Sequence, residues 1–151
     1  MLIKILFTVK LDKVDKLEFI KTKYFPPKGF LFCMWCGKLL YREEKDSIIN
    51  SNESYIKTLL HHEQIHLDQA KNAGSFLKFY LLYFWNWLKN FSFSKKGAYY
   101  TNKYEVEAYA NENNLDYVGT GDNKYDLKDK RMLYKRHKKN WKVWIKSYYR
   151  N

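Results

Sequence analysis

The sequence is poor in cysteine, proline and glycine, and the scarcity of each residue type argues against certain classes of protein. Its 151 residues include only 2 cysteines, Cys33 and Cys36, so we expect no disulfide framework and a reducing, cytoplasmic setting. With 2 prolines and 6 glycines there is no Pro/Gly/Ser-rich linker, and no internal repeat divides the chain. These absences predict a single domain over residues 1–151.

Acidic residues and arginine are also scarce. There are 16 Asp and Glu against 28 Lys and Arg, which gives a formal net charge of +12, and only 4 of the basic residues are arginine. A charge of this size can indicate nucleic acid or an anionic membrane. Proteins that recognise bases and phosphates favour the planar guanidinium group of arginine. Because arginine is scarce here, nucleic acid is not expected as a partner. We expect a solvated lysine surface, and a weak association with an anionic membrane surface stays open as the alternative.

Long uncharged hydrophobic runs are missing as well. The first ten residues have no apolar signal core and are predicted to form a strand. The segment Phe76–Leu88 is apolar nearly all round, but Lys78, Asn86 and Lys89 interrupt it, and a bilayer span needs about 20 apolar residues. We interpret this segment as a buried core helix, with an interfacial membrane helix as the alternative.

What the chain does contain is a complete H-E-x-x-H pattern, His62-Glu63-Gln64-Ile65-His66. From the numbers of His and Glu in the chain, chance would produce about 0.005 such matches in a shuffled sequence. Two histidines four residues apart lie on one face of a helix, where both imidazoles can reach one metal ion. The pattern therefore predicts a metal site.

The surrounding sequence places this pattern on the inward face of a helix. Capping residues at 51–54 and Gly74 predict a helix over about 54–73, and apolar residues recur along it at helical spacing. Zn²⁺ binds neutral imidazole readily, and Glu63 is placed to take a proton from water at the metal. The alternative, a pair of surface histidines, fits the inward face poorly.

The remaining segments predict an α+β fold, with a small N-terminal antiparallel or mixed sheet over about 1–45 and about four helices. Within the sheet, Phe30–Cys36 and Lys38–Arg42 read as strands separated by Gly37. Lys95–Ala98 reads as a loop. Helices are expected over about 102–116 and, rich in basic residues, over about 127–149.

At this point the chain resembles the zincin metallopeptidases, and more closely their glutamate-ligand branch. In that branch a later helix carries a Glu followed by Ala three residues on, which matches Glu105 and Ala108 here. The whole chain resembles small bacterial zincin-like proteins of one domain. The resemblance implies a zincin-like fold, a zinc ion bound by His62, His66 and Glu105, and Glu63 as the general base of peptide-bond hydrolysis.

Two alternatives stay open at this site. The family has Asp or Asn where this chain has Tyr109, so another acceptor must orient the first histidine, and Asp116, Glu112 or a backbone carbonyl could do so. Glu107 competes with Glu105 as third ligand. The two lie about 200° apart around a helix, so only one can face the metal, and we choose Glu105 on the family pattern.

Other residues have weaker predicted roles. The strand 30–36 could bind an extended peptide by adding it to the sheet edge, or could be an ordinary core strand. Its two cysteines are expected to be buried thiols, since three-residue spacing in a strand separates them. His61 points away from His62 and is not expected to be a ligand. A further set of residues could stabilise a transition state, three of them as hydrogen-bond donors to an oxyanion: His137, and Tyr99, Tyr100 or Tyr109 as the donor.

The sequence thus predicts a zinc-dependent metallopeptidase that acts on a peptide or protein substrate. The alternative is a metal-binding domain, or a pseudoenzyme, that does not cleave peptides and uses a basic, aromatic surface to bind membrane or nucleic acid. In that case the protein would be peripheral to the membrane.

Overall fold

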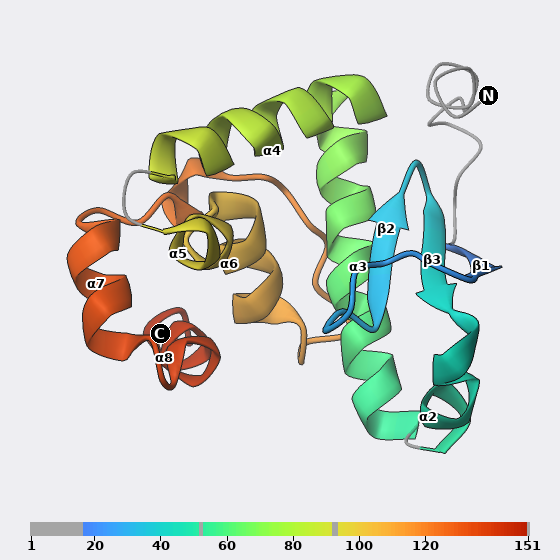
Figure 1. The fold of residues 1–151 in the computed structure, drawn as a ribbon. Helices are drawn as coiled ribbons and strands as arrows, with labels where there is room; N and C mark the ends of the chain where they lie inside the picture. The colour runs from blue at the N-terminus through green and yellow to red at the C-terminus, as the bar shows by residue number, and fades with distance from the viewer. Residues whose placement is uncertain (1–16, 52, 92–93, 151) are drawn as a thin grey trace.

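The computed structural model describes residues 17–51, 53–91 and 94–150, which form a three-stranded sheet and seven α-helices (Figure 1). The α+β class expected from the sequence is therefore confirmed. The strand predicted for the first ten residues lies outside the described part of the chain.

The sheet has the strand order β1-β3-β2. Strands β2 (Phe32–Trp35) and β3 (Lys38–Arg42) form an antiparallel hairpin, as the sequence predicted, and β1 (Glu18–Thr22) pairs in parallel with β3. The hairpin turns at Cys36 and Gly37, whose φ angles of 51° and 77° are typical of a two-residue turn. This order leaves β2 at one edge of the sheet.

The long helix α3 (Glu53–Ala73) stands between the sheet and the helices that follow it in the chain (Figure 1). Its bounds agree with the predicted helix over 54–73, and Gly74, at a φ of 88°, ends it. A short helix, α2 (Asp46–Ser51), and a 3₁₀ turn at Glu43–Lys45 connect β3 to it. α3 thus lies between β2 and a later helix, α6 (Lys103–Asn111), and contacts both.

The aromatic helix α4 (Phe76–Asn90) begins at Ser75, whose side chain accepts a hydrogen bond from Lys78 N. We expected it to be buried all round, and this is wrong. One face is buried, whereas large apolar side chains on the opposite face are exposed: Leu77, Leu81, Phe84, Trp85 and Leu88. Within the described residues, no helix is long and apolar enough to cross a membrane.

The buried face of α4 is partly polar because it holds the short segment that joins the next two helices. Asn86 Oδ1 accepts a hydrogen bond from Lys103 N at 3.0 Å, and Asn90 Nδ2 donates to the carbonyl of Thr101 at 3.2 Å. Asn102 Nδ2 donates to the carbonyl of Tyr83. These bonds satisfy buried polar groups and fix the first turn of α6 against α4.

Residues 95–98, predicted as a loop, are helical: α5 covers Lys95–Tyr100. Ser94 caps it by accepting from Gly97 N, and Gly97 and Ala98 are buried, so packing overrides the weak helix propensity of glycine. α6 (Lys103–Asn111) follows and is shorter than the predicted helix over 102–116.

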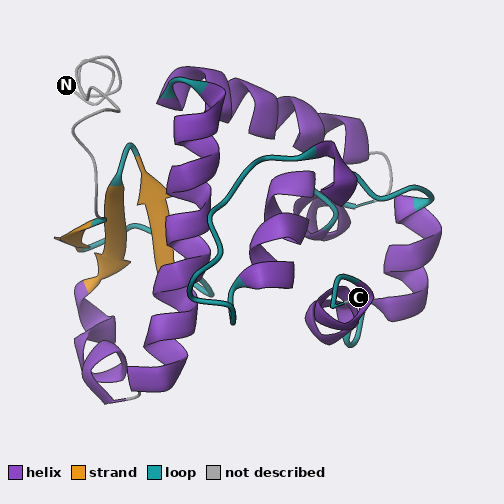
Figure 2. Cartoon of the chain, turned by 180° about the vertical axis from the view of Figure 1, so that it is seen from behind, coloured by secondary structure: helices purple, strands orange, loops and turns teal. Residues whose placement is uncertain are grey.

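Beyond α6 the chain runs back along α3 as an extended loop (Figure 2). Gly119 packs so closely on this helix that a Cβ there would lie 2.3 Å from the carbonyl oxygen of Ile65. Only glycine fits this approach. The loop then enters a 3₁₀ turn at Asn123–Tyr125.

The predicted basic helix over 127–149 is two helices, α7 (Lys130–His137) and α8 (Trp141–Tyr148). A turn after His137 folds α8 back, so that His137 stacks on Trp144 with ring centroids 4.6 Å apart. The break is explained by packing, because it brings α7 and α8 together in the cluster of buried side chains that includes Val106 of α6.

Candidate metal centre

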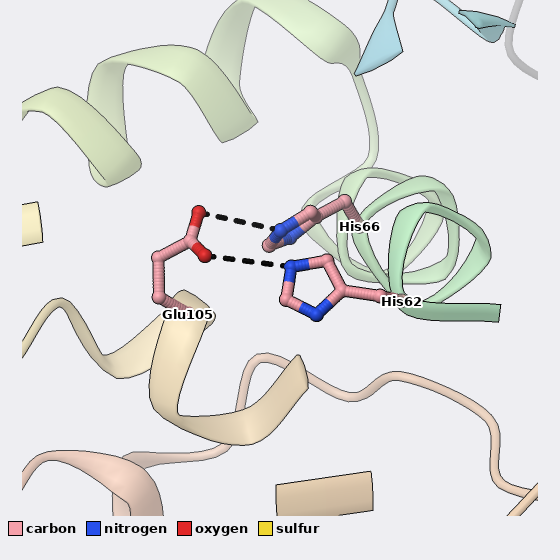
Figure 3. Close-up of side chains that lie close together, drawn as sticks. All are labelled: His62, His66 and Glu105. Atoms are coloured by element: carbon pink, nitrogen blue, oxygen red, sulfur yellow. Dashed lines mark ion pairs between the residues drawn. The ribbon is translucent and has the colours of Figure 1, made fainter. Parts of the chain in front are cut away.

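Helices α3 and α6 bring the two motif histidines and one glutamate together. His62 and His66 lie one turn apart on α3, and Glu105 lies in the first turn of α6, pointing at both imidazoles (Figure 3). Glu105 Oε2 lies 3.5 Å from His62 Nε2, and Oε1 lies 3.4 Å from His66 Nε2. One ligand atom from each residue falls within 4.8 Å of the others, so the three side chains could hold a metal ion.

These three side chains are buried and strongly coupled by charge. Burial alone would lower the pKa of His62, but contacts with Glu105 and Glu112 outweigh it and raise that pKa to about 10. The pKa of His66 is also raised, because the charge of Glu105 outweighs burial. Burial would raise the pKa of Glu105, yet the two histidines lower it. The site thus keeps an anionic carboxylate opposite two imidazoles that hold their protons tightly, and a metal ion that binds there must displace those protons.

One carboxylate oxygen of Glu105 forms no hydrogen bond within the described part of the chain. Tyr83 Oη donates to Oε1 at 2.7 Å, whereas Oε2 is buried and has no hydrogen-bond partner among the described residues. A buried carboxylate oxygen without a donor is costly unless a cation satisfies it. This atom, together with two imidazole nitrogens, forms a donor set that fits a metal ion.

His62 is oriented by Glu112, one of the three acceptors that the sequence left open. His62 Nδ1 lies 2.9 Å from Glu112 Oε2, and Lys146 Nζ of α8 lies 2.8 Å from the other carboxylate oxygen. At the position where the family has Asp or Asn, the ring of Tyr109 packs on His62 at a centroid distance of 4.6 Å. Asp116 is exposed and does not take part. A carboxylate on Nδ1 leaves Nε2 free to face Glu105.

His66 is oriented by Gln69, a residue that the sequence analysis missed. Its Nδ1 lies 2.8 Å from Gln69 Oε1, and Gln69 Nε2 donates to the carbonyl of Tyr104 and to Glu107. The signal in the sequence was the position of Gln69, three residues after His66 and hence on the same helix face. Tyr83 and Lys146 were also missed, because neither shares a short motif with its partner.

Glu107, the competing ligand, lies in a different environment. Its carboxylate is fully buried and accepts hydrogen bonds from Gln69, Tyr117, Gly121 and both the amide and hydroxyl of Thr120. Every oxygen is satisfied, and all the donors except Gln69 of α3 come from the loop that follows α6. Glu107 therefore holds that loop, while Glu105 faces the histidines.

Glu63 lies beside the cluster of His62, His66 and Glu105 and is held by the strand β2. Its Oε2 accepts a hydrogen bond from Met34 N of β2 at 3.0 Å. Burial raises the pKa of Glu63, although the positive charge of both histidines works against that shift. A carboxyl group with a raised pKa, fixed at a pocket wall, is suited to accept and return a proton.

Two pockets meet at Glu63. The larger, of about 570 Å³, reaches His62 and Glu63 from the side of α5 and α8. The smaller, of about 210 Å³, reaches Glu63, His66 and Glu105 from the side of α4. Phe30, Phe32 and Tyr99 border both. A bound molecule in either pocket would therefore lie next to the cluster.

The other residues considered from the sequence lie in several places. Cys36 is buried and Cys33 half-buried, both as free thiols, and burial together with Glu63 and Glu105 raises the pKa of Cys33 to about 12. His61 faces the backbone carbonyls of Glu112 and Tyr117. The remaining candidates divide between pocket walls and a distant stack: Tyr99, Tyr100 and Tyr109 line the larger pocket, and His137 stacks on Trp144.

Comparison of the chain with protein-family models, with curated proteins and with solved structures finds no match in any of the three.

Proposed function

We propose that the protein is a zinc-dependent metallopeptidase with a zincin-like fold. The observation that carries this proposal is the convergence of His62, His66 and Glu105 beside Glu63, at a junction of two pockets. An edge strand, a helix with two histidines and a second helix with a glutamate are the parts that the zincin resemblance implies. Their arrangement here supports that fold and that chemistry.

The donor set supports zinc. The contacts of Glu105 Oε2 with His62 Nε2 and of Oε1 with His66 Nε2 measure 3.5 Å and 3.4 Å, close to the separation of about 3.4 Å between ligand atoms of a tetrahedral zinc ion with bonds of about 2.0–2.1 Å. One ligand atom from each residue lies within 4.8 Å of the others, so the side chains must draw together to share one ion. Three protein ligands of the His₂Glu type leave a fourth position for water, as a catalytic rather than a structural zinc site requires. Among the described residues, no thiol belongs to this cluster.

Zinc at such a site supplies Lewis acidity and lowers the pKa of a coordinated water towards neutrality. In the proposed reaction Glu63 accepts a proton from the attacking water and then delivers it to the amine of the leaving peptide. Met34 N–H holds the carboxylate of Glu63 in place for both transfers. Glu112 and Gln69 keep the two imidazoles in the tautomer that presents Nε2 to the metal.

The edge strand β2 is the proposed binding site for the backbone of the substrate. Met34 N–H points away from β3 towards Glu63, so by alternation the N–H and C=O of Phe32 also face the edge that is not paired with β3. A peptide that pairs there adds a strand to the sheet and passes Glu63. Backbone pairing of this kind binds many sequences, and the pockets would select among them.

The test is peptide cleavage measured by mass spectrometry on an unfolded protein substrate, with and without a zinc chelator. The Glu63→Gln variant removes the base but keeps the ligands, so it should retain one equivalent of zinc and lose about 10²–10⁴ in rate. Glu43→Gln, an exposed glutamate outside both pockets, is the matched control and should leave cleavage unchanged. Cleavage that survives both the chelator and Glu63→Gln would refute the proposal.

A second candidate function is binding to an anionic membrane surface without proteolysis. The exposed apolar side chains of α4 favour it, and Lys78 and Lys89 flank them on the same helix. Flotation with vesicles of phosphatidylcholine and phosphatidylserine tests it. Binding should fall when Leu81 and Trp85 are both changed to Ser, and a wild-type protein that stays with the unbound fraction would exclude this candidate.

A further inference from the structure

Three lysines line the larger of the two pockets. Lys95 and Lys96 come from α5, and Lys142 comes from α8, so segments far apart in the sequence contribute to one basic wall. Among the described residues that border this pocket, Glu63 is the only acidic one. Away from the proposed metal, the pocket therefore carries a positive charge.

The positive charge of these lysines is not neutralised by neighbouring carboxylates. In the described part of the chain no ion pair is formed by any of the three, whereas Lys130 and Lys146 each contact a carboxylate. Two of the three lie over aromatic rings instead: Lys142 Nζ is 4.4 Å from the ring centroid of Tyr109, and Lys96 Nζ is 5.9 Å from that of Tyr100. An aromatic ring holds an ammonium group in place but leaves it a full charge.

The smaller pocket has the opposite character. Its walls include the rings of Phe79, Tyr80 and Tyr83 and the side chain of Met34, and no lysine or arginine borders it. Together with Glu63, His66 and Glu105, which also border the pocket, these side chains favour a bulky apolar group and disfavour an anionic one. The two pockets meet at Glu63, so a peptide chain that passes this residue would have one flank in a basic environment and the other in an aromatic one.

We propose that the preferred substrate places a carboxylate against Lys95, Lys96 and Lys142 and a bulky apolar side chain in the aromatic pocket. The carboxylate is either an Asp or Glu side chain near the cleaved bond or the C-terminal carboxylate of the peptide. The inference rests on the proposed peptidase function, and it adds the substrate class. Since each exposed ion pair contributes little alone, the three lysines together should raise affinity about tenfold.

The first arm of the test measures binding without cleavage. Zinc-loaded Glu63→Gln protein is titrated with four fluorescent octapeptides that share a central Leu. The reference is a neutral peptide with both ends blocked. Two further blocked peptides carry two Glu residues before or after the Leu, and the fourth is the neutral peptide with a free C-terminal carboxylate. We expect at least one carboxylate-bearing peptide to bind about tenfold more tightly than the blocked neutral one. The identity of that peptide tells whether a side chain or the chain end supplies the carboxylate.

The second arm changes the lysines. Lys95→Gln/Lys96→Gln/Lys142→Gln should abolish the preference, while a matched set of exposed lysines outside the pocket should leave it intact: Lys128→Gln/Lys138→Gln/Lys139→Gln. Circular dichroism checks that both triple variants fold. Equal binding of all four peptides, or a preference that survives the pocket variant, overturns the inference. Binding of anionic vesicles or DNA that depends on the same lysines, without any peptide preference, overturns it as well.

Cleavage of the same peptides by the wild-type protein separates this inference from the proposed function. Cleavage with equal kcat/KM for charged and neutral peptides would leave the peptidase function standing and refute the substrate class. Charge-selective binding without any cleavage would refute the peptidase function and leave the recognition of carboxylate-bearing peptides standing.

Discussion

Glu105 and Glu107 stand two residues apart on the same helix, and both are buried, yet their surroundings differ completely. Glu107 accepts five hydrogen bonds and leaves neither oxygen without a donor. Glu105 faces two histidines and keeps one oxygen, Oε2, without a hydrogen-bond partner among the described residues. A carboxylate whose two oxygens both accept hydrogen bonds stabilises the fold. A carboxylate that faces imidazoles and keeps one oxygen without a donor is available for a metal.

The comparison shows that burial alone does not identify a functional carboxylate. Both glutamates would be judged important from their exposed fractions of 3% and 0%. What separates them is the chemistry of the neighbours: backbone and side-chain donors around Glu107, and nitrogen ligands around Glu105. A substitution at Glu105 should therefore mainly weaken metal binding, whereas a substitution at Glu107 should mainly lower the stability of the fold.

Glu105→Gln should cause the largest change, a loss of zinc affinity on the order of 10³-fold, because it removes a charged ligand. The free energy of unfolding of the metal-free protein should fall less than in Glu107→Gln, because the amide can still accept from Tyr83 and the imidazoles can release their protons. Competition with a chromogenic chelator measures the affinity. Zinc binding equal to that of the wild type would mean that Glu105 is not a ligand.

Glu107→Gln should show the opposite pattern. The amide turns one acceptor oxygen into a donor that faces at least two other donors, which should cost about 3 kcal/mol of unfolding free energy. Urea unfolding of the metal-free protein measures this loss. Any Glu107→Gln protein that remains folded should keep its zinc affinity within a few-fold, and a selective loss of zinc with unchanged stability would remove the distinction.

Glu112→Ala tests the support of the site rather than its ligands. His62 would lose the acceptor at its Nδ1, and Lys146 would lose its partner, so zinc affinity should fall about 10–100-fold. The exposed carboxylate of Asp116 provides the control, and Asp116→Ala should leave zinc affinity unchanged. Equal effects of the two substitutions would mean that Glu112 does not orient His62.

Tyr83→Phe should cause the smallest change. It removes the hydroxyl that donates to Glu105 Oε1 at 2.7 Å and leaves the ring in place. Loss of one hydrogen bond to a charged group should lower zinc affinity about tenfold, with little effect on stability. The same chelator competition measures it, and a change larger than that of Glu105→Gln would contradict the assignment of Glu105 as the ligand and Tyr83 as its support.

Short-range patterns made part of this arrangement predictable. Helical spacing placed His62, Glu63 and His66 on an inward face, and the strand pattern located the β2-β3 hairpin. The choice of Glu105 over Glu107 came from the family pattern, because the helix wheel leaves both at the edge of the apolar stripe. In the structure the two glutamates differ because the loop after α6 donates hydrogen bonds to Glu107. These donors lie 10 or more residues downstream of Glu107, beyond the reach of a helix pattern.

Long-range packing accounts for what the sequence did not predict. The helix α5 depends on burial of Gly97 and Ala98, which local propensity does not reveal. The break between α7 and α8 arises because Trp141 and Ile145 pack with Val106 of α6. The exposed apolar face of α4 looks identical in sequence to a buried one, since hydrophobicity all round a helix does not tell what covers it.

The most direct test of the central claim is a crystal of the zinc-loaded protein measured at the zinc absorption edge. The account predicts one strong anomalous peak about 2.0–2.2 Å from His62 Nε2, His66 Nε2 and a carboxylate oxygen of Glu105, with Glu107 remote from it. A peak bound by Glu107 or by a cysteine, or no peak between the two histidines, would contradict the account.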